Sequence, residues 1–140
     1  MKVRTKRLTD VPLPCRQTEG SAGFDLCAAE ETVIPAHAYA SVGTGIALEL
    51  PGKMEAQVRP RSGLAAKHGI GILNSPGTID SDYRGEIRVI LFNTSGTSYR
   101  VSRGDRIAQL VFSVLTDVEL VEADALSETR RGSGGFGHTG

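Results

Sequence analysis

Apolar and polar residues alternate with a period of two in several short runs of the chain. Positions 54–59 alternate strictly, and the apolar residues at 87, 89 and 91 would share one face of a strand. A period of two is typical of a half-buried strand, and proline or glycine ends most of these runs. We expect strands at 2–8, 24–28, 32–35, 40–50, 54–59, 70–74, 87–92, 98–101, 106–115 and 118–121.

Residues 62–68 form the one convincing helical stretch, about two turns long. Ser62 can cap it, residues 64–67 are good helix formers, and Gly69 can end it. Around ten short strands with one short helix and frequent turns favour an all-β sandwich or barrel. Among these we favour a jelly-roll-like double sheet.

Net charge, apolar runs and cysteine count exclude several classes of function for this chain. The chain has 140 residues and a formal net charge of zero, so we expect one domain and no nucleic-acid partner held by phosphate neutralisation. The sequence contains no apolar run long enough for a membrane span, and the basic N-terminus leads into no signal-peptide stretch. Two cysteines are too few for a disulfide framework. We therefore expect no membrane contact and an intracellular, reducing location, the cytoplasm.

The turn at 77–86 carries the candidate chemistry. Asp80, Asp82 and Tyr83 lie between two glycines and directly before the strand at 87–92. Like charges two residues apart can raise one carboxyl pKa and produce a general base. The alternative is an Asp-rich hairpin turn with solvated carboxylates.

The end of the chain differs in composition from the rest. From position 130 two arginines and one phenylalanine stand among glycines. Glycine amides and arginine forks suit phosphate oxygens, and a phenyl ring can stack on a base. We therefore predict a catalytic β-domain at 1–123 and a flexible arm at 124–140 that closes over a nucleotide. The alternative is a disordered end.

Two upstream segments could also bind phosphate. Arg61, Ser62 and Gly63 begin the helix, where unpaired N–H groups attract anions, although Ser62 could simply be a cap. Segment 104–109 places polar groups beside an apolar strand, although it could be a plain turn with an Asp105–Arg106 pair. No P-loop motif is present.

Five segments in order resemble the motifs of the homotrimeric dUTPase family, the deoxyuridine 5′-triphosphate nucleotidohydrolases. Together they cover nearly the whole chain from Ala22 onward, which makes a coincidental match in a plain β-domain improbable. The segments are 22–26 (AGFDL), 60–65 (PRSGLA), 74–85 (NSPGTIDSDYRG), 104–110 (GDRIAQL) and 131–140 (RGSGGFGHTG).

The resemblance implies hydrolysis of dUTP to dUMP and pyrophosphate, which keeps uracil out of DNA and supplies dUMP for dTMP synthesis. It makes Asp80 the general base that activates water for attack on the α-phosphorus. It places Tyr83 under the deoxyribose, where a ribose 2′-hydroxyl would clash. The other implied substrate contacts are Asn74 with hairpin residues Gly77, Thr78 and Ile79 at the uracil, Arg61, Ser62, Gly63 and Gln109 at the triphosphate, Arg131 at the γ-phosphate, and Phe136 on the uracil with Gly135 and Gly137 beside it.

The resemblance also implies Mg²⁺, bound mainly through the substrate triphosphate and reached by Asp25 through water only. It implies a homotrimer whose sites take the third motif from one subunit and the arm from another. The related dCTP deaminases use a glutamate on the strand after the turn, where this chain has Ile90, so we expect no deamination. A trimeric interaction protein that keeps the nucleotide site as a switch is a further alternative, although Asp80, Arg131 and Phe136 favour catalysis.

Overall fold

The computed structural model describes residues 1–135, in which eleven strands and one short helix alternate with turns. Their bounds are β1 (Arg4–Arg7), β2 (Phe24–Cys27), β3 (Thr32–Ile34), β4 (Tyr39–Gly43), β5 (Ile46–Glu49), β6 (Met54–Arg59), α1 (Ser62–His68), β7 (Ile70–Ile72), β8 (Gly77–Ile79), β9 (Arg88–Asn93), β10 (Tyr99–Val101) and β11 (Arg106–Val114). The all-β prediction is confirmed.

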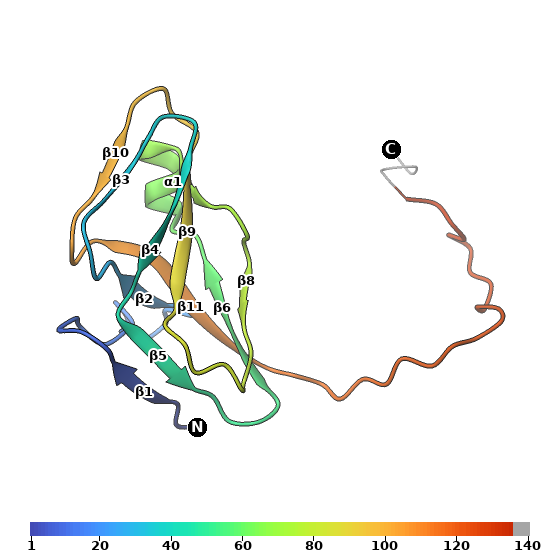
Figure 1. Ribbon diagram of the computed structural model, residues 1–140. Helices are drawn as coiled ribbons and strands as arrows, with labels where there is room; N and C mark the ends of the chain where they lie inside the picture. The colour runs from blue at the N-terminus through green and yellow to red at the C-terminus, as the bar shows by residue number, and fades with distance from the viewer. Residues whose placement is uncertain (136–140) are drawn as a thin grey trace.

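The strands form antiparallel sheets that pack into one body (Figure 1). A four-stranded sheet has the order β2-β11-β6-β8, and a three-stranded sheet has the order β4-β9-β7. Two smaller sheets pair β1 with β5 and β10 with β3. Many neighbours in these sheets come from distant parts of the sequence, so strand pairing brings separated motifs together.

The core lies between the sheets. In β6 the even positions are buried and the odd positions are not, as the strict alternation predicts. On β9 the alternation buries Val89, Leu91 and Asn93, and Ile87 is buried just before the strand. Leu26 of β2 and Leu110 of β11 are also fully buried.

Helix α1 has the predicted bounds, but its start differs from the prediction. Arg61 is the N-cap residue, and its side chain makes no capping hydrogen bond. The proposed cap at Ser62 is therefore wrong, because Ser62 already belongs to the first helical turn. Gly69 ends the helix with φ 65°, the left-handed conformation that glycine adopts without a Cβ penalty.

Three strand predictions need correction. Residues 40–50 form two strands, β4 and β5, separated by a bend at Gly45 with φ 66°. Residues 77–79 are a strand and not part of a turn, because they pair with 56–58 of β6. Residues 118–121 are not a strand, since they pair with no strand among residues 1–135.

After β11 the chain leaves the body and extends away from it (Figure 1). Residues 116–133 are exposed throughout. In the described part of the chain α1 is only seven residues long, so no helix there could cross a bilayer.

Candidate active site

The first group of candidate residues surrounds a buried carboxylate on β2. Only 4% of Asp25 is exposed. Its Oδ1 lies 3.4 Å from Nε of Arg61, and its Oδ2 lies 3.2 Å from Nη1 of Arg106. Gln109 Nε2 donates a hydrogen bond of 3.4 Å to Oδ1. Because a buried charge is tolerated only when cations and donors compensate it, Asp25 gathers two guanidinium groups and an amide at one place.

The sheet register explains how these residues meet. Gln109 of β11 lies directly opposite Asp25 of β2. Residues three apart in a regular strand point to opposite faces, but the register shifts between Arg106 and Ala108, so both Arg106 and Gln109 reach Asp25. Arg61 arrives from the end of β6 and donates a 3.0 Å hydrogen bond to the Arg106 carbonyl.

Arg106 belongs to this group although its sequence position alone did not mark it as a site residue. The alternative of an Asp105–Arg106 pair does not match the described contacts. Asp105 Oδ2 instead accepts a 2.8 Å hydrogen bond from the Ser102 amide, and Arg106 pairs with Asp25. The only signal in the sequence was the position of Arg106 inside segment 104–110.

Ser62 and Gly63 are exposed at the start of α1 beside this group. A side chain added at Gly63 would meet no atom within 4 Å, so the space there is open. Arg61 and Arg106 also line a shallow cavity of about 240 Å³ next to the helix. The two guanidinium groups, the hydroxyl and the open space together fit an anion such as a phosphate chain.

The second group lies on the turn between β8 and β9. Asp80 follows the last residue of β8, and both Asp80 and Tyr83 are exposed. The Tyr83 amide donates a 3.2 Å hydrogen bond to the Asp80 carbonyl, which closes the turn. The Asp80 carboxylate has no hydrogen-bond or ion-pair partner among residues 1–135. With Thr78 and Ile79, these residues line a cavity of about 280 Å³.

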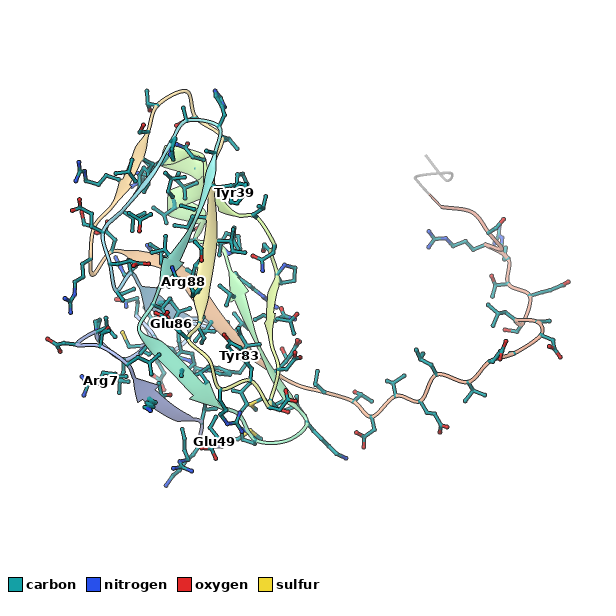
Figure 2. The ribbon with its side chains drawn as sticks, in the orientation of Figure 1. Arg7, Tyr39, Glu49, Tyr83, Glu86 and Arg88 are labelled. Atoms are coloured by element: carbon teal, nitrogen blue, oxygen red, sulfur yellow. The ribbon has the colours of Figure 1, made fainter. Side chains whose placement is uncertain are left out.

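Tyr83 is held in one orientation by its neighbours. Its hydroxyl donates a 2.9 Å hydrogen bond to the Glu86 carbonyl, and Figure 2 shows Tyr83 and Glu86 close together at this edge. A Cβ added at Gly85 would lie 2.4 Å from the Tyr83 hydroxyl oxygen. Only glycine at position 85 therefore leaves room for this tyrosine position.

Asn74 is exposed on the loop that leads into β8. A Cβ added at Gly77 would lie 3.3 Å from Asn74 Nδ2, so the amide side chain lies against the start of β8. The structure thus places Asn74, Gly77, Thr78 and Ile79 on one loop and the following strand β8, which continues into Asp80.

The two groups lie at opposite ends of β6. Ile79 pairs with Ala56 near the start of β6, whereas Arg61 follows the end of β6. A strand rises about 3.3 Å per residue, which separates Asp80 from Arg61 by roughly 15–20 Å along the strand. Within one chain the structure does not bring the turn carboxylate to the arginine group.

The arm residues lie apart from both groups. Arg131 is exposed, and its Nε donates a 2.8 Å hydrogen bond to the Gly134 carbonyl inside a local turn. Gly135 is half-buried. Phe136 and Gly137, which the family resemblance places in the site, lie outside the described residues.

Cys27 lies beside Asp25 but does not resemble a reactive thiol. Partial burial raises the pKa of the Cys27 thiol, and the nearby Asp25 carboxylate raises it further. A raised pKa keeps the thiol protonated at neutral pH and therefore poorly nucleophilic. This agrees with a packing role for Cys27.

Comparison with known proteins shows close similarity over the full chain. The family model described as dUTPase matches residues 9–140. A protein of Wolinella succinogenes named deoxyuridine 5′-triphosphate nucleotidohydrolase is 55% identical, with 100% of this chain and 95% of the relative covered. A protein of the same name from Nautilia profundicola is 49% identical, with coverage of 100% and 99%.

A solved structure has the same overall architecture. The dUTPase of Staphylococcus bacteriophage 80alpha, in a mutant form with dUpNHpp, superposes with a TM-score of 0.92 at 26% identity. The superposition covers 99% of this chain and 98% of the phage protein. A likeness of this extent includes both groups of candidate residues and the segment after β11.

Proposed function

This chain belongs to the dUTPase family and is a dUTP diphosphatase, and we propose that Asp80 activates the water that attacks the α-phosphorus of dUTP. One observation supports this assignment most strongly: Asp80 and Tyr83 lie on one turn and line the same cavity. An exposed carboxylate without a partner in the described chain is free to accept a proton from water.

Substrate selection follows from the groups around that cavity. Tyr83 would lie against the deoxyribose, where its ring leaves no room for a 2′-hydroxyl. Asn74 lies against Gly77, so its amide and the backbone of Thr78 and Ile79 would read the uracil edge. Backbone and amide groups suit this role because they present donors and acceptors in fixed positions.

The triphosphate would bind at the arginine group around Asp25. Arg61, Ser62, Gly63 and Gln109 would contact the phosphates, and the arm would add Arg131 at the γ-phosphate with Phe136 on the uracil, flanked by Gly135 and Gly137. Two guanidinium groups already lie within 3.4 Å of Asp25. A positive field of this kind stabilises charge that develops on the leaving pyrophosphate.

Mg²⁺ fits this site when the substrate carries it. Both oxygens of Asp25 already face donors from Arg61, Arg106 and Gln109, so Asp25 would reach the ion through water. Mg²⁺ is commonly bound by substrate phosphates, one or two carboxylates and several waters. Bound by the phosphates here, it would supply further positive charge at the leaving group. Asp25 would then orient the arginines and one water of the ion's shell.

We also propose a homotrimer with shared sites. The separation of roughly 15–20 Å between Asp80 and Arg61 along β6 supports a site that takes its turn from one copy and its phosphate-binding group from another. Residues 124–135, the described part of the arm that we assign to 124–140, extend away from the body of their own chain (Figure 1). In an assembly it would reach a neighbouring copy.

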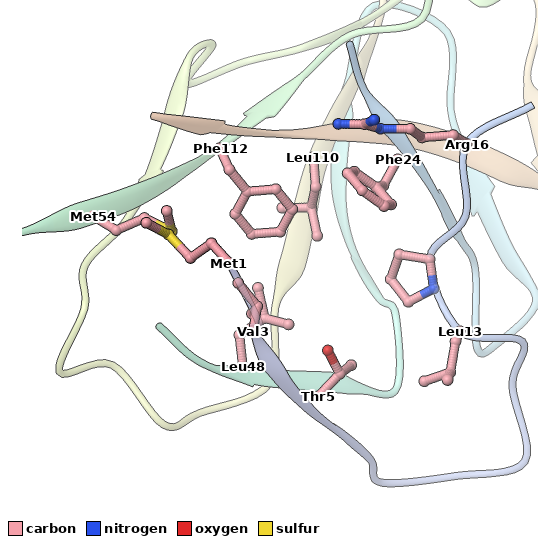
Figure 3. A pocket seen from close by; sticks show the side chains of 11 residues that line it. Met1, Val3, Thr5, Leu13, Arg16, Phe24, Leu48, Met54, Leu110 and Phe112 are labelled. Atoms are coloured by element: carbon pink, nitrogen blue, oxygen red, sulfur yellow. The ribbon is translucent and has the colours of Figure 1, made fainter. Parts of the chain in front are cut away.

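The segment between β11 and the arm supports the same assembly. Its apolar side chains are exposed, with Val118 at 75% and Leu120 at 95%. An apolar cavity of about 420 Å³ opens between the N-terminal strand and the sheet (Figure 3), where Val3 faces Phe24 and Phe112 across the gap. β1 pairs only with β5, so its other edge is unpaired in the described chain. Residues 118–121 of another copy would fill this cavity and pair with the free edge of β1.

The trimer predicts a specific mass in solution. Light scattering should give about three times the 14.8 kDa chain mass. Leu120→Asp should shift the mass toward the monomer, because burial of one leucine stabilises a contact by roughly 1.5–3 kcal/mol and a charge reverses that gain. As a control, Leu126→Asp should leave the mass unchanged, since Leu126 lies outside the segment 118–121 that would fill the cavity. A wild-type monomer that hydrolyses dUTP would contradict shared sites.

A nucleotide panel tests the proposed function directly. The protein should release pyrophosphate from dUTP in Mg²⁺, and should do so far more slowly from UTP, dTTP or dCTP. No ammonia should appear from dCTP, because β9 has the half-buried apolar side chain of Ile90 where a deaminase needs a glutamate. Equal rates on UTP and dUTP would contradict the role of Tyr83.

A further inference from the structure

The Glu86 side chain connects the end of the Asp80–Tyr83 turn to the bend at Gly45, between β4 and β5. Its Oε1 accepts a 2.8 Å hydrogen bond from the Gly45 amide, and its Oε2 lies 3.1 Å from Arg88 Nη1. Gly45 is buried, so its amide depends on a protein acceptor. The Glu86 carbonyl also accepts the Tyr83 hydroxyl at 2.9 Å. One residue thus contacts both the bend and the turn.

Arg88 and Glu30 hold that carboxylate in place. Arg88 Nη2 lies 3.0 Å from Glu30 Oε1, and its Nε donates a 3.0 Å hydrogen bond to Ser41 Oγ. Glu30 Oε1 in turn accepts the Gly43 amide at 2.8 Å. The hydrogen bonds from the Gly43 amide and Arg88 lower the pKa of Glu30, so it is ionised at neutral pH. We call Glu30, Glu86 and Arg88 the carboxylate clamp.

The space around the clamp leaves little freedom. A Cβ added at Gly43 would lie 2.7 Å from Glu86 Oε1 and 3.0 Å from Arg88 Nη1. Exposed ion pairs contribute little by themselves, and the clamp side chains are 29–47% exposed. What distinguishes this group is that both carboxylates bind backbone amides of one buried bend, so they fix the geometry of the backbone.

The rest of the attachment is independent of the clamp. The Ile87 amide donates to the Ile46 carbonyl at 2.8 Å, and Thr44 Oγ1 donates to the Ile87 carbonyl at 2.6 Å. These bonds secure the start of β9 even without Glu86. Loss of the clamp should therefore loosen residues 80–86 and leave the fold intact.

We propose that Glu86, held by Arg88 and Glu30, is a positioning residue that sets the place of Asp80 and Tyr83 in the cavity. Figure 2 shows Tyr83, Glu86 and Arg88 in the same region of the body. The inference rests on the proposed function, because it assigns Glu86 an effect on water activation and on the exclusion of ribose. Glu86 and Arg88 also line the cavity that Asp80 and Tyr83 share.

Glu86→Gln tests the proposal. Its amide oxygen can still accept the Gly45 amide, but its NH₂ group would face the Arg88 guanidinium, so the ion pair between Glu86 and Arg88 is lost. We expect kcat on dUTP to fall by about 10- to 100-fold, because misplacement of a catalytic group by about 1 Å has effects of that order. The preference for dUTP over UTP should fall as well, while the melting temperature stays near that of wild type.

Two further variants serve as a parallel test and a control. Arg88→Gln should reproduce both losses, and the double variant should be no worse than either single one, because the residues act as one unit. Glu31→Gln removes a comparable surface pair with Arg100 and should behave as wild type. The proposal would be overturned if Glu86→Gln left kcat and selectivity unchanged. It would also be overturned if the losses multiplied in the double variant while the melting temperature fell. An inactive wild type would instead refute the proposed function.

Discussion

Asp80→Asn is expected to bind dUTP with nearly wild-type affinity and to hydrolyse it about 10²- to 10⁴-fold more slowly, the usual contribution of a general base. Asparagine keeps the shape of aspartate but cannot accept the proton of the attacking water. The Asp80 side chain has no partner in the described chain, so its loss leaves no donor unsatisfied. Pyrophosphate release measures turnover, and calorimetry with dUTP and Mg²⁺ measures binding.

Asp82→Asn is the matched control for this experiment. Asp82 is an exposed carboxylate of the same turn, two residues away, and it does not line the cavity that Asp80 and Tyr83 share. We expect wild-type turnover from it. If Asp82→Asn were the inactive variant and Asp80→Asn the active one, the general base would be assigned to the wrong carboxylate.

Removal of residues 132–140 is expected to leave a folded trimer that has lost nearly all activity. The described residues beyond 115 form no strand and contribute nothing to the buried core, so the melting temperature should stay close to that of the full chain. In the proposed site the arm covers the nucleotide and excludes water, so its removal should leave the substrate open to solvent. Steady-state kinetics, thermal melting and light scattering together test this expectation.

A mixing experiment connects these two variants. Asp80→Asn chains carry an intact arm, and truncated chains carry an intact Asp80. If one site draws these parts from different copies, trimers refolded from a mixture should regain activity that neither variant has alone. Sites built within one chain would stay inactive in every mixture. Wild-type kinetics from the truncated protein alone would refute the covering role of the arm.

Local sequence was sufficient for most of the regular elements. The alternation over 54–59 predicted β6, and good helix formers followed by Gly69 predicted the bounds of α1. Both signals act over a few residues, because burial parity and backbone conformation depend on near neighbours. The candidate residues of the turn and of the arm likewise came from motifs that are contiguous in sequence, and their roles stay predictions.

Two elements were assigned wrongly because pairing is not local. Residues 77–79 contain a glycine and look like a turn, yet β6 supplies a partner that makes them a strand. The segment 118–121 was expected to be a strand, but it pairs with no other strand in the described part of its chain. A strand satisfies its backbone groups only through a neighbour, so alternation alone cannot decide its existence.

The sequence by itself determined the all-β class, the helix and the positions of the chemically distinctive residues, because these depend on composition and short-range periodicity. Only the tertiary structure decided that Arg106 joins Gln109 at Asp25, since a shift in register between β11 and β2 changes which side chains share a face. It also decided that the turn lies at the far end of β6 from Arg61. Such distances follow from strand pairing between remote segments, which no local pattern encodes.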